Sequence, residues 1–411
     1  MRLAQVLPSP TEVEVEALPD LLTGLRKARR RPFDASVQTF TAALSRALLG
    51  HPRFRELPEL AALGYWLRPS AVRRLAGGRD TAGGIDVPRG VVFHVPPANV
   101  DTMFVYSWML SALCGNANVV RVPTRRTPST EILLDLLGTL LTRHPDISAS
   151  TSLLSYGHDA EITSVLSSSC DVRVLWGGDE TVRRLRLAPL PPRATELTFP
   201  DRFSMSVLGA ASLAEFSDAD MATLGDAFAN DVFWFDQGGC SSPRLVIWVG
   251  SEPQVKKAST RLYGAVADAV ARRGWSVALG LVLAKQAFAF DSILEDDLEQ
   301  VRFHSNEITV LRLKTLSALR RQHPGGGAFF EHVVESVSDL VGDLEGRDQT
   351  LTYSGIDVDE LAQLVVALNG EGIDRVVPVG QALSFSRYWD GHDLLRSFSR
   401  RVDVPELGPT A

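Results

Sequence analysis

The sequence predicts an α/β protein in which helices cover both faces of a parallel sheet. Between residues 90 and 187, apolar segments rich in β-branched residues alternate with segments of helical periodicity. The strand segments are 90–97, 117–123 and 171–178, and the helical segments are 104–116, 127–144 and 179–187. Strands that alternate with helices at this spacing form parallel sheets that are buried on both sides.

A second series of strands and helices begins near Pro200 and predicts a second α/β unit. Strands are expected at 202–210, 244–250, 308–313 and 375–380, with helices near 227–235 and around 255–274. Residues 1–85 are expected to be mostly helical, because apolar residues recur at helical spacing before Gly50, a typical helix end.

Composition limits the classes of function. The 49 acidic and 42 basic residues give a formal net charge of −7, which disfavours a nucleic-acid-binding protein, since such proteins present a basic face. Three cysteines in 411 residues cannot form a disulfide framework and indicate a reducing compartment. The N-terminal segment lacks the pattern of a secretory signal, and apolar runs such as 277–284 are too short to span a bilayer. We therefore expect a cytoplasmic protein without a membrane span.

Cys240 is the residue whose surroundings suggest chemistry. Two glycines precede it and a strong strand follows, so it is expected on a tight turn where the backbone can approach a ligand. Its neighbours Gly239, Ser241 and Ser242 are small and leave the sulfur accessible, and the N–H groups of the turn could face a developing oxyanion. These residues alone fit a nucleophile and a buried structural thiol equally well.

The other cysteines and the nucleotide-binding motifs point to no further site. Cys114 ends an apolar helix and Cys170 precedes a strand, so both are interpreted as packing residues. The three thiols lie too far apart, without nearby histidine pairs, for a zinc site, and no metal is expected. No G-x-G-x-x-G sequence follows a strand, and no Walker loop is present. The residues by themselves therefore predict an α/β enzyme candidate with one accessible cysteine.

Four segments, in order along the chain, carry a family pattern. They are HVPPANVD and its continuation over 94–130, FPDRFSMSVLG over 199–209, DQGGCSSPRLVIW over 236–248, and the C-terminal segment 372–404. Together they resemble the aldehyde-dehydrogenase superfamily and, more closely, the long-chain acyl-CoA reductases of bacterial bioluminescence, the LuxC-like family.

The resemblance implies an aldehyde-dehydrogenase-like α/β fold, with a parallel-sheet cofactor-binding domain, an α/β catalytic domain and an active site in the cleft between them. We expect an N-terminal helical region and the nicotinamide cofactor-binding domain within residues 1–200. The catalytic domain is expected within 201–380, and a C-terminal segment over 381–411.

The resemblance also assigns the reacting groups. Cys240 matches the family's nucleophile, whose thiolate would attack a thioester carbonyl and hold the acyl group. Asn99, in the segment PPANVD, matches an asparagine whose amide helps to hold the oxyanion together with the N–H of the cysteine. From the residues alone, Asn99 would be a turn residue.

The cofactor is expected to be NADPH. The resemblance places cofactor contacts on the segment after the second strand, at Arg121, Pro123, Thr124, Arg125 and Arg126, and on the glycines Gly177 and Gly178 beside the pyrophosphate. The segment 121–130 offers arginines and no acidic residue, which favours a 2′-phosphate over free ribose hydroxyls. Alternatively, Arg125 and Arg126 form a solvated helix entrance.

Glu196 is the nearest equivalent of the glutamate that activates water in acid-forming aldehyde dehydrogenases, but it lacks the two glycines that follow there. We favour a thiol as the acyl acceptor and expect an acyl thioester, of coenzyme A or a carrier protein, to be reduced to a fatty aldehyde. Two alternatives stay open: oxidation of an aldehyde to a free acid, and a non-catalytic acyl-transfer subunit of a reductase complex. A homo-oligomer is expected from the superfamily.

Overall fold

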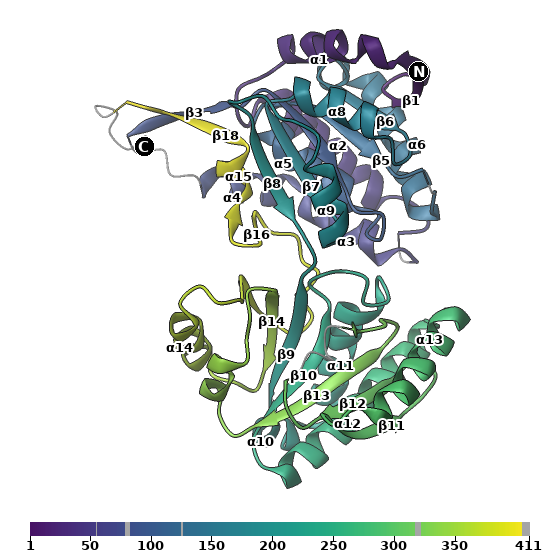
Figure 1. The fold of residues 1–411 in the computed structure, drawn as a ribbon, viewed down its shortest axis with the longest axis vertical. Coiled ribbons are helices and arrows are strands. Elements are labelled where there is room, and N and C mark those ends of the chain that lie inside the picture. The colour runs from purple at the N-terminus through teal and green to yellow at the C-terminus, as the bar shows by residue number, and fades with distance from the viewer. Residues whose placement is uncertain (55, 79–82, 125, 317–321, 405–411) are drawn as a thin grey trace. The chain divides into compact units, whose positions relative to one another are not determined.

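The computed structural model describes residues 1–54, 56–78, 83–124, 126–316 and 322–404 (Figure 1). The chain forms two compact units. Unit 1 contains Met1–Pro200 and Phe385–Ala411, and unit 2 contains Asp201–Ser384. The assignment of cofactor binding to one part of the chain and catalysis to the other stays a prediction.

Unit 1 is built on a seven-stranded sheet with the order β2-β1-β6-β5-β4-β7-β8. Its strands are β1 (Arg2–Leu7), β2 (Thr11–Glu14), β4 (Val91–Val95), β5 (Ala117–Val122), β6 (Thr151–Ser155), β7 (Val172–Trp176) and β8 (Thr195–Phe199). Its helices are η1 (Val15–Ala17), α1 (Leu18–Lys27), α2 (Ala35–Leu49), α3 (Pro58–Trp66), α4 (Pro69–Gly77), α5 (Met103–Leu113), α6 (Pro128–Arg143), α7 (Pro145–Ser148), α8 (Ala160–Ser169) and α9 (Asp179–Leu185).

The five strands from β6 to β8 are parallel, and helices cover both of their faces. All residues of β4, β7 and α5 are buried, as expected for central elements of a doubly wound sheet. On one face α1, α8 and α9 pack against the strands, and α5 packs on the other. The chain reverses direction across the sheet between β4 and β7, which is where such folds bind ligands at the carboxyl ends of the strands.

Residues 1–85 are mostly helical, as expected, through α1 to α4, but β1 and β2 also add two antiparallel strands to the sheet of unit 1, which the sequence did not predict. Leu3 and Leu7 of β1 are buried, while Arg2 and Ala4 are exposed. Strand β1 pairs with β2, which follows it closely, and with β6, about 150 residues further along the chain; nothing in the local sequence identifies the pairing with β6 that joins this hairpin to the sheet.

The segment after unit 2 returns to unit 1. It contains β16 (Tyr388–Trp389), β17 (His392–Asp393), α15 (Leu394–Ser397) and β18 (Ser399–Asp403). Strand β18 pairs antiparallel with β3 (Gly84–Pro88). Two buried polar side chains also hold this segment: the Tyr106 hydroxyl donates to the Ser386 carbonyl at 2.6 Å, and the Asn116 amide donates to the Phe398 carbonyl at 2.8 Å.

Unit 2 contains a second seven-stranded sheet, with the order β11-β12-β13-β10-β9-β14-β15. Its strands are β9 (Phe203–Gly209), β10 (Pro243–Val249), β11 (Leu298–Phe303), β12 (Thr309–Leu313), β13 (Ala328–Val334), β14 (Asp348–Ser354) and β15 (Arg375–Pro378). Its helices are α10 (Ala210–Ala214), α11 (Asp218–Phe233), α12 (Glu252–Arg273), α13 (Leu279–Asp291), η2 (Ser292–Leu294), η4 (Val337–Gly342) and α14 (Val358–Leu368).

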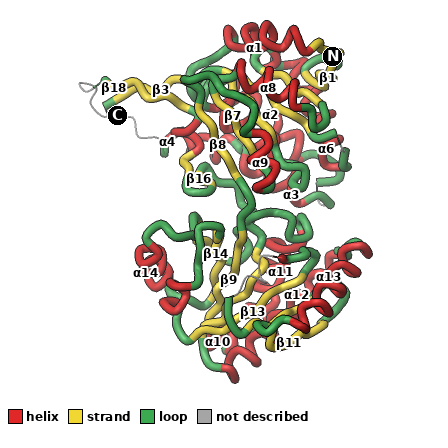
Figure 2. The backbone as a smooth tube through the Cα atoms, in the orientation of Figure 1, coloured by secondary structure: helices red, strands yellow, loops and turns green. Residues whose placement is uncertain are grey.

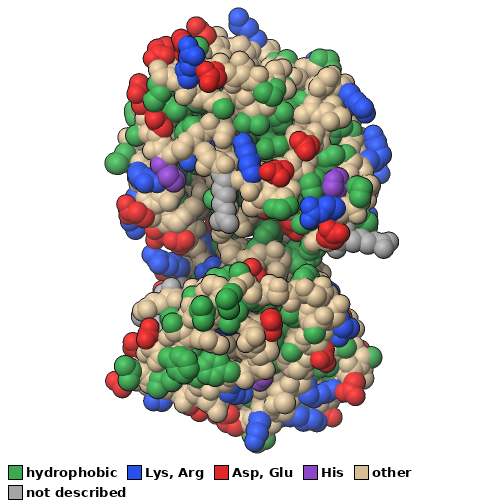
Figure 3. Space-filling view, turned by 90° about the vertical axis from the view of Figure 1, so that its right-hand side faces the viewer, with side chains coloured by type: hydrophobic (Ala, Val, Ile, Leu, Met, Phe, Trp, Pro, Cys, Tyr) green, Lys and Arg blue, Asp and Glu red, His purple; other side chains and the backbone are tan. Residues whose placement is uncertain are grey.

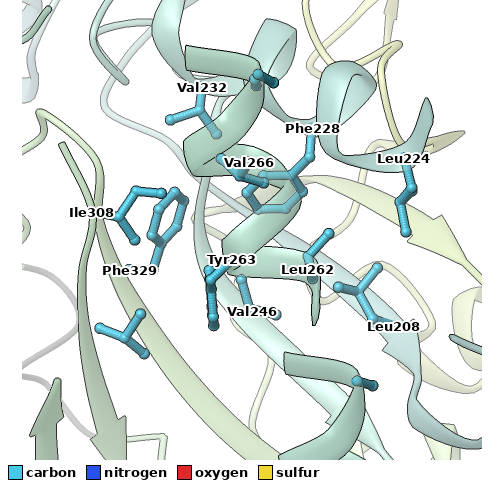
Figure 4. Close-up of a cluster of buried hydrophobic side chains, with 14 of the residues drawn as sticks. Leu208, Leu224, Phe228, Val232, Val246, Leu262, Tyr263, Val266, Ile308 and Phe329 are labelled. Carbon is cyan, nitrogen blue, oxygen red and sulfur yellow. The ribbon is translucent and has the colours of Figure 1, made fainter. Parts of the chain in front are cut away.

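Side chains of the unit 2 strands alternate between two cores, one on each face of the sheet. Figure 2 shows α14 on one side of these strands and α12 and α13 on the other. Val246 and Trp248 of β10 pack with α10, α11 and α12, and Figure 4 shows the central part of this cluster. Leu245 and Ile247 of the same strand pack with α14 and η4 on the opposite face. Because both faces of β10 are buried, this strand is fixed in position, and with it the end that follows the cysteine segment.

On the face shown in Figure 3, acidic and basic side chains are interspersed over the surface. Among the described residues, no helix combines the length and the apolar character needed to cross a bilayer.

Candidate active site

Cys240 lies on a tight loop between α11 and β10. Within this loop, Asp236 and Gln237 both have left-handed backbone conformations, with φ of 48° and 60°. The buried side chain of Gln237 holds the loop in this conformation through three hydrogen bonds. Its Nε2 donates to the carbonyls of Pro243 at 3.0 Å and Ala328 at 2.9 Å, and its Oε1 accepts from Gly327 N at 2.8 Å. These three bonds fix the loop to the strand that follows it and to the start of β13.

The three cysteines differ in accessibility. Cys114 and Cys170 are buried, whereas Cys240 is half-buried. Burial is the main factor that raises the pKa of Cys170 to about 12, which keeps that thiol protonated and unreactive at neutral pH. Cys240 is therefore the thiol that a substrate can reach.

Arg244 is a half-buried cation that interacts electrostatically with Cys240. Arg244 is the second residue of β10, and its Nη2 donates to the Gln237 carbonyl at 3.2 Å. Burial lowers the pKa of the Arg244 guanidinium, and its attraction to Cys240 opposes that shift. The same attraction stabilises a thiolate at Cys240 relative to the thiol.

Three strands contribute to the surroundings of Cys240 at the amino edge of the unit 2 sheet. Cys240 lies three residues before β10, Ser204 lies near the start of β9, and Gln349 lies near the start of β14. The Ser204 hydroxyl donates to the Cys240 carbonyl at 2.6 Å, and the Gln349 amide Nε2 lies 3.7 Å from the Cys240 sulfur. Sequence reasoning did not identify Gln349, because it lies 109 residues from Cys240 and belongs to no recognisable motif.

Asn99 lies in unit 1, on the loop that follows β4 at the carboxyl edge of the parallel sheet, and it is exposed. This is the edge at which doubly wound sheets bind ligands. Asn99 and Cys240 belong to different units, so their cooperation at one carbonyl group stays a prediction.

A cavity of about 290 Å³ in unit 1 lies at the ends of β5 and β6. Arg121 comes from β5, His158 and Asp159 follow β6, and Arg184 and Leu185 come from α9. The remaining lining residues are Ala160, Thr163, Ser164, Leu187, Ala188 and Pro189. The cavity thus combines an apolar wall with two guanidinium groups and an imidazole.

The cationic groups of this cavity are held by their neighbours. Arg121 Nη2 donates to the Gly157 carbonyl at 3.0 Å, and Arg184 Nη2 lies 3.3 Å from His158 Nδ1. The Asp159 carboxylate accepts a hydrogen bond from Ile162 N at 2.9 Å and caps α8. Arg121 was predicted as a cofactor residue, whereas His158 and Arg184 were missed because neither belongs to a motif.

Those of the other predicted cofactor residues that the structure describes lie outside the lining of this cavity. Pro123 and Thr124 follow β5, and Arg125 falls outside the described residues. Arg126 Nη1 donates to the Pro123 carbonyl at 2.9 Å, at the entrance to α6.

The two glycines of the predicted pyrophosphate turn lie between β7 and α9. Gly177 has a φ of 155°, which favours glycine, and Gly178 is the N-cap of α9. They follow β7 at the point where the chain reverses direction across the sheet, so the turn occupies the position expected for cofactor binding.

Glu196 forms ion pairs within unit 1. It lies on β8, where Oε2 accepts from Arg173 Nε at 2.7 Å and Oε1 pairs with Arg186 Nε at 2.8 Å. The Arg173 side chain is only 2% exposed. Both carboxylate oxygens of Glu196 are thus bound to arginines, and the predicted role in activating water is untested.

The fold defines the class of this protein. Aldehyde dehydrogenase 21 from Physcomitrella patens matches it with a TM-score of 0.71 at 10% identity, over 98% of this chain and 97% of that chain. A NAD-dependent benzaldehyde dehydrogenase from Corynebacterium glutamicum matches with a TM-score of 0.65 at 14% identity, over 98% and 93%. The predicted aldehyde-dehydrogenase-like fold is confirmed.

The family follows from the sequence. The family model described as acyl-CoA reductase (LuxC) matches residues 84–401, which is more than half of the chain. The chain belongs to this LuxC acyl-CoA reductase family, as predicted.

Curated relatives are named long-chain acyl-protein thioester reductase. The one from Aliivibrio fischeri is 27% identical over 165 residues, 40% of this chain and 33% of that protein. The one from Photorhabdus laumondii is 20% identical over 321 residues, 77% of this chain and 63% of that protein. The matches therefore span between a third and less than two thirds of the length of these relatives.

Proposed function

We propose that this protein reduces an acyl thioester to an aldehyde with NADPH, through an acyl group carried on Cys240. The observation that carries the proposal is the environment of Cys240. Cys240 is the most accessible of the three thiols, its loop is held by the Gln237 side chain, and it interacts with the half-buried cation of Arg244. The names of the curated relatives support a long-chain acyl thioester, of coenzyme A or a carrier protein, as the substrate.

The chemistry of the first half-reaction is acyl transfer. The Cys240 thiolate attacks the thioester carbonyl carbon, and the oxyanion that forms accepts hydrogen bonds from the Asn99 amide and the Cys240 N–H. The carbon–sulfur bond to the leaving thiol breaks, and that thiolate takes a proton from solvent. Arg244 favours the charged form of the Cys240 sulfur throughout.

The second half-reaction returns the sulfur to its starting state. When bound, the nicotinamide cofactor supplies a hydride to the acyl carbon. The carbon–sulfur bond to Cys240 then breaks, the aldehyde leaves, and the electron pair returns to the sulfur. Because both oxygens of Glu196 are paired with arginines, no carboxylate is assigned here to activate water, and the aldehyde is the expected product.

The cavity at the ends of β5 and β6 suits the adenosine end of a dinucleotide. Leu185 offers an apolar wall for the base, and Arg121 and Arg184 offer guanidinium groups for a 2′-phosphate. We assign phosphate selection to Arg121 and Arg184, because both line this cavity whereas Arg126 does not. Contacts from Arg125, a cytoplasmic location and a homo-oligomeric state stay predictions.

The test of this function is an acylation experiment followed by product analysis. Without cofactor, an acyl-CoA should leave one acyl group on the Cys240 peptide, detected by mass spectrometry. Adding NADPH should release the aldehyde. Cys240→Ala should abolish both results, whereas the matched control Cys114→Ala should retain the adduct. An adduct on another peptide, or a free acid as the only product, would contradict the proposal.

A further inference from the structure

Gln349 presents a buried amide to the sulfur of Cys240. It is the second residue of β14 and only 2% exposed. Its Nε2 lies 3.7 Å from the Cys240 sulfur, within the reach of an N–H···S hydrogen bond. On the other side of the amide, Oε1 accepts from the Ser241 hydroxyl at 3.1 Å and from the Thr350 hydroxyl at 3.4 Å.

The orientation of this amide decides its effect on the sulfur. Because two hydroxyl groups donate to Oε1, the amide nitrogen is the atom that faces Cys240. An N–H group that donates to sulfur favours the thiolate, since the negative charge makes sulfur a stronger acceptor. The reversed amide would present a carbonyl oxygen, which would accept from the S–H group and favour the neutral thiol.

The main chain also ties Gln349 to the cysteine loop. Ser204 donates its hydroxyl hydrogen to the Cys240 carbonyl at 2.6 Å and accepts from Thr350 N at 3.2 Å. One buried serine thus connects the cysteine to the residue next to Gln349. The amide and the sulfur are held together through both side chain and backbone, so the donor is positioned before substrate binds.

We propose that Gln349 is a further catalytic residue, whose amide N–H stabilises the Cys240 thiolate. When the S–H bond breaks, its proton passes to solvent and the electron pair stays on the sulfur beside the amide. The same donor stabilises the sulfur again when the aldehyde leaves and the thiolate is restored. The catalytic part of this proposal rests on the proposed function, whereas the effect on the thiol does not.

The test measures the ionisation of Cys240 directly. The rate of alkylation of the Cys240 peptide by iodoacetamide is followed from pH 5 to pH 10 by mass spectrometry, for the full chain. Replacing Gln349 by methionine keeps the length of the side chain and removes the donor. A hydrogen bond to a charged group stabilises it by about 1.5–3 kcal/mol, so the midpoint of the alkylation profile should rise by about one pH unit or more. Gln349→Glu should raise it further, because a carboxylate repels the thiolate.

Two further variants keep the test decisive. Gln300→Met repeats the substitution at an exposed glutamine of unit 2 and should leave the midpoint unchanged. Ser241→Ala removes the hydroxyl that orients the amide and should raise the midpoint by a smaller amount. The serine variant answers the question if Gln349→Met proves unstable in a thermal melt.

The outcomes separate this inference from the proposed function. An unchanged or lowered midpoint in both Gln349→Met and Ser241→Ala would overturn the inference, even if the wild type carries an acyl group on Cys240. A raised midpoint together with slower acylation would support it. A raised midpoint in the variants, combined with a wild type that forms no acyl adduct, would overturn the catalytic role together with the proposed function.

Discussion

Replacing Glu196 by glutamine should destabilise unit 1 and leave acylation of Cys240 intact in the molecules that stay folded. The glutamate side chain is 15% exposed, and its partner Arg173 is 2% exposed. Removing one member of a buried ion pair costs about 3–5 kcal/mol, because the remaining charge is left without compensation. Arg173 keeps hydrogen bonds to the Ser167 hydroxyl at 3.0 Å and the Ala188 carbonyl at 2.7 Å. The expected loss is therefore near the lower limit, about 3 kcal/mol.

The assay is urea unfolding followed by tryptophan fluorescence, together with the acyl adduct counted per folded molecule. The control is Glu180→Gln on α9, whose carboxylate pairs with Arg183 while both side chains are largely exposed. Such a surface pair contributes at most about 1 kcal/mol. A Glu196→Gln variant as stable as the wild type would refute the structural argument. If that stable variant also lost hydrolytic release of the acyl group, the water-activating role would be supported instead.

Three further predictions concern the oxyanion, the cofactor and pH. Asn99→Ala should lower turnover about a hundredfold, since losing one oxyanion donor costs about 3 kcal/mol; near-normal turnover would return Asn99 to the role of a turn residue. Arg184→Gln should weaken NADPH binding about tenfold and leave NADH binding nearly unchanged, as measured by fluorescence titration; equal changes for both cofactors would contradict a phosphate contact. Burial lowers the pKa of His94 to about 4, from 6.5 when unfolded. The unfolded chain therefore takes up the proton first, and stability falls as pH drops below about 6.5 and towards pH 4, by about 2 kcal/mol at pH 5. His94→Gln should lack this part of the loss between pH 7.5 and pH 5 in urea unfolding, and an identical pH dependence in both proteins would refute it.

The repeating pattern of unit 1 could be predicted because its signals are local. The predicted strand 90–97 contains Val91–Val95, and the predicted helix 104–116 overlaps Met103–Leu113. Each of these elements is apolar enough to be recognised from its own residues. The place of β1 and β2 in the sheet was missed because this hairpin joins the sheet through β6, which supplies no signal to the first residues of the chain.

The site was predicted only in part, for the same reason. Cys240 stands out because of the glycines and small residues around it, which are its sequence neighbours. Gln349 and Arg184 are ordinary residues in their own segments, and the roles proposed for them rest on contacts across the sheet or around a cavity. A glutamine in a strand or an arginine near the end of a helix is too common to be selected from sequence.

The return of residues 385–403 to unit 1 has a consequence for synthesis of the chain on the ribosome. Unit 2 is continuous from 201 to 384, so all of its strands have emerged while unit 1 still lacks β18 and the partners of Tyr106 and Asn116. Although unit 1 begins first, it is completed last, in contrast to the usual N-terminal-first order of domains. A ribosome that stops shortly after residue 384 thus releases a complete unit 2 beside a unit 1 with an unpaired β3.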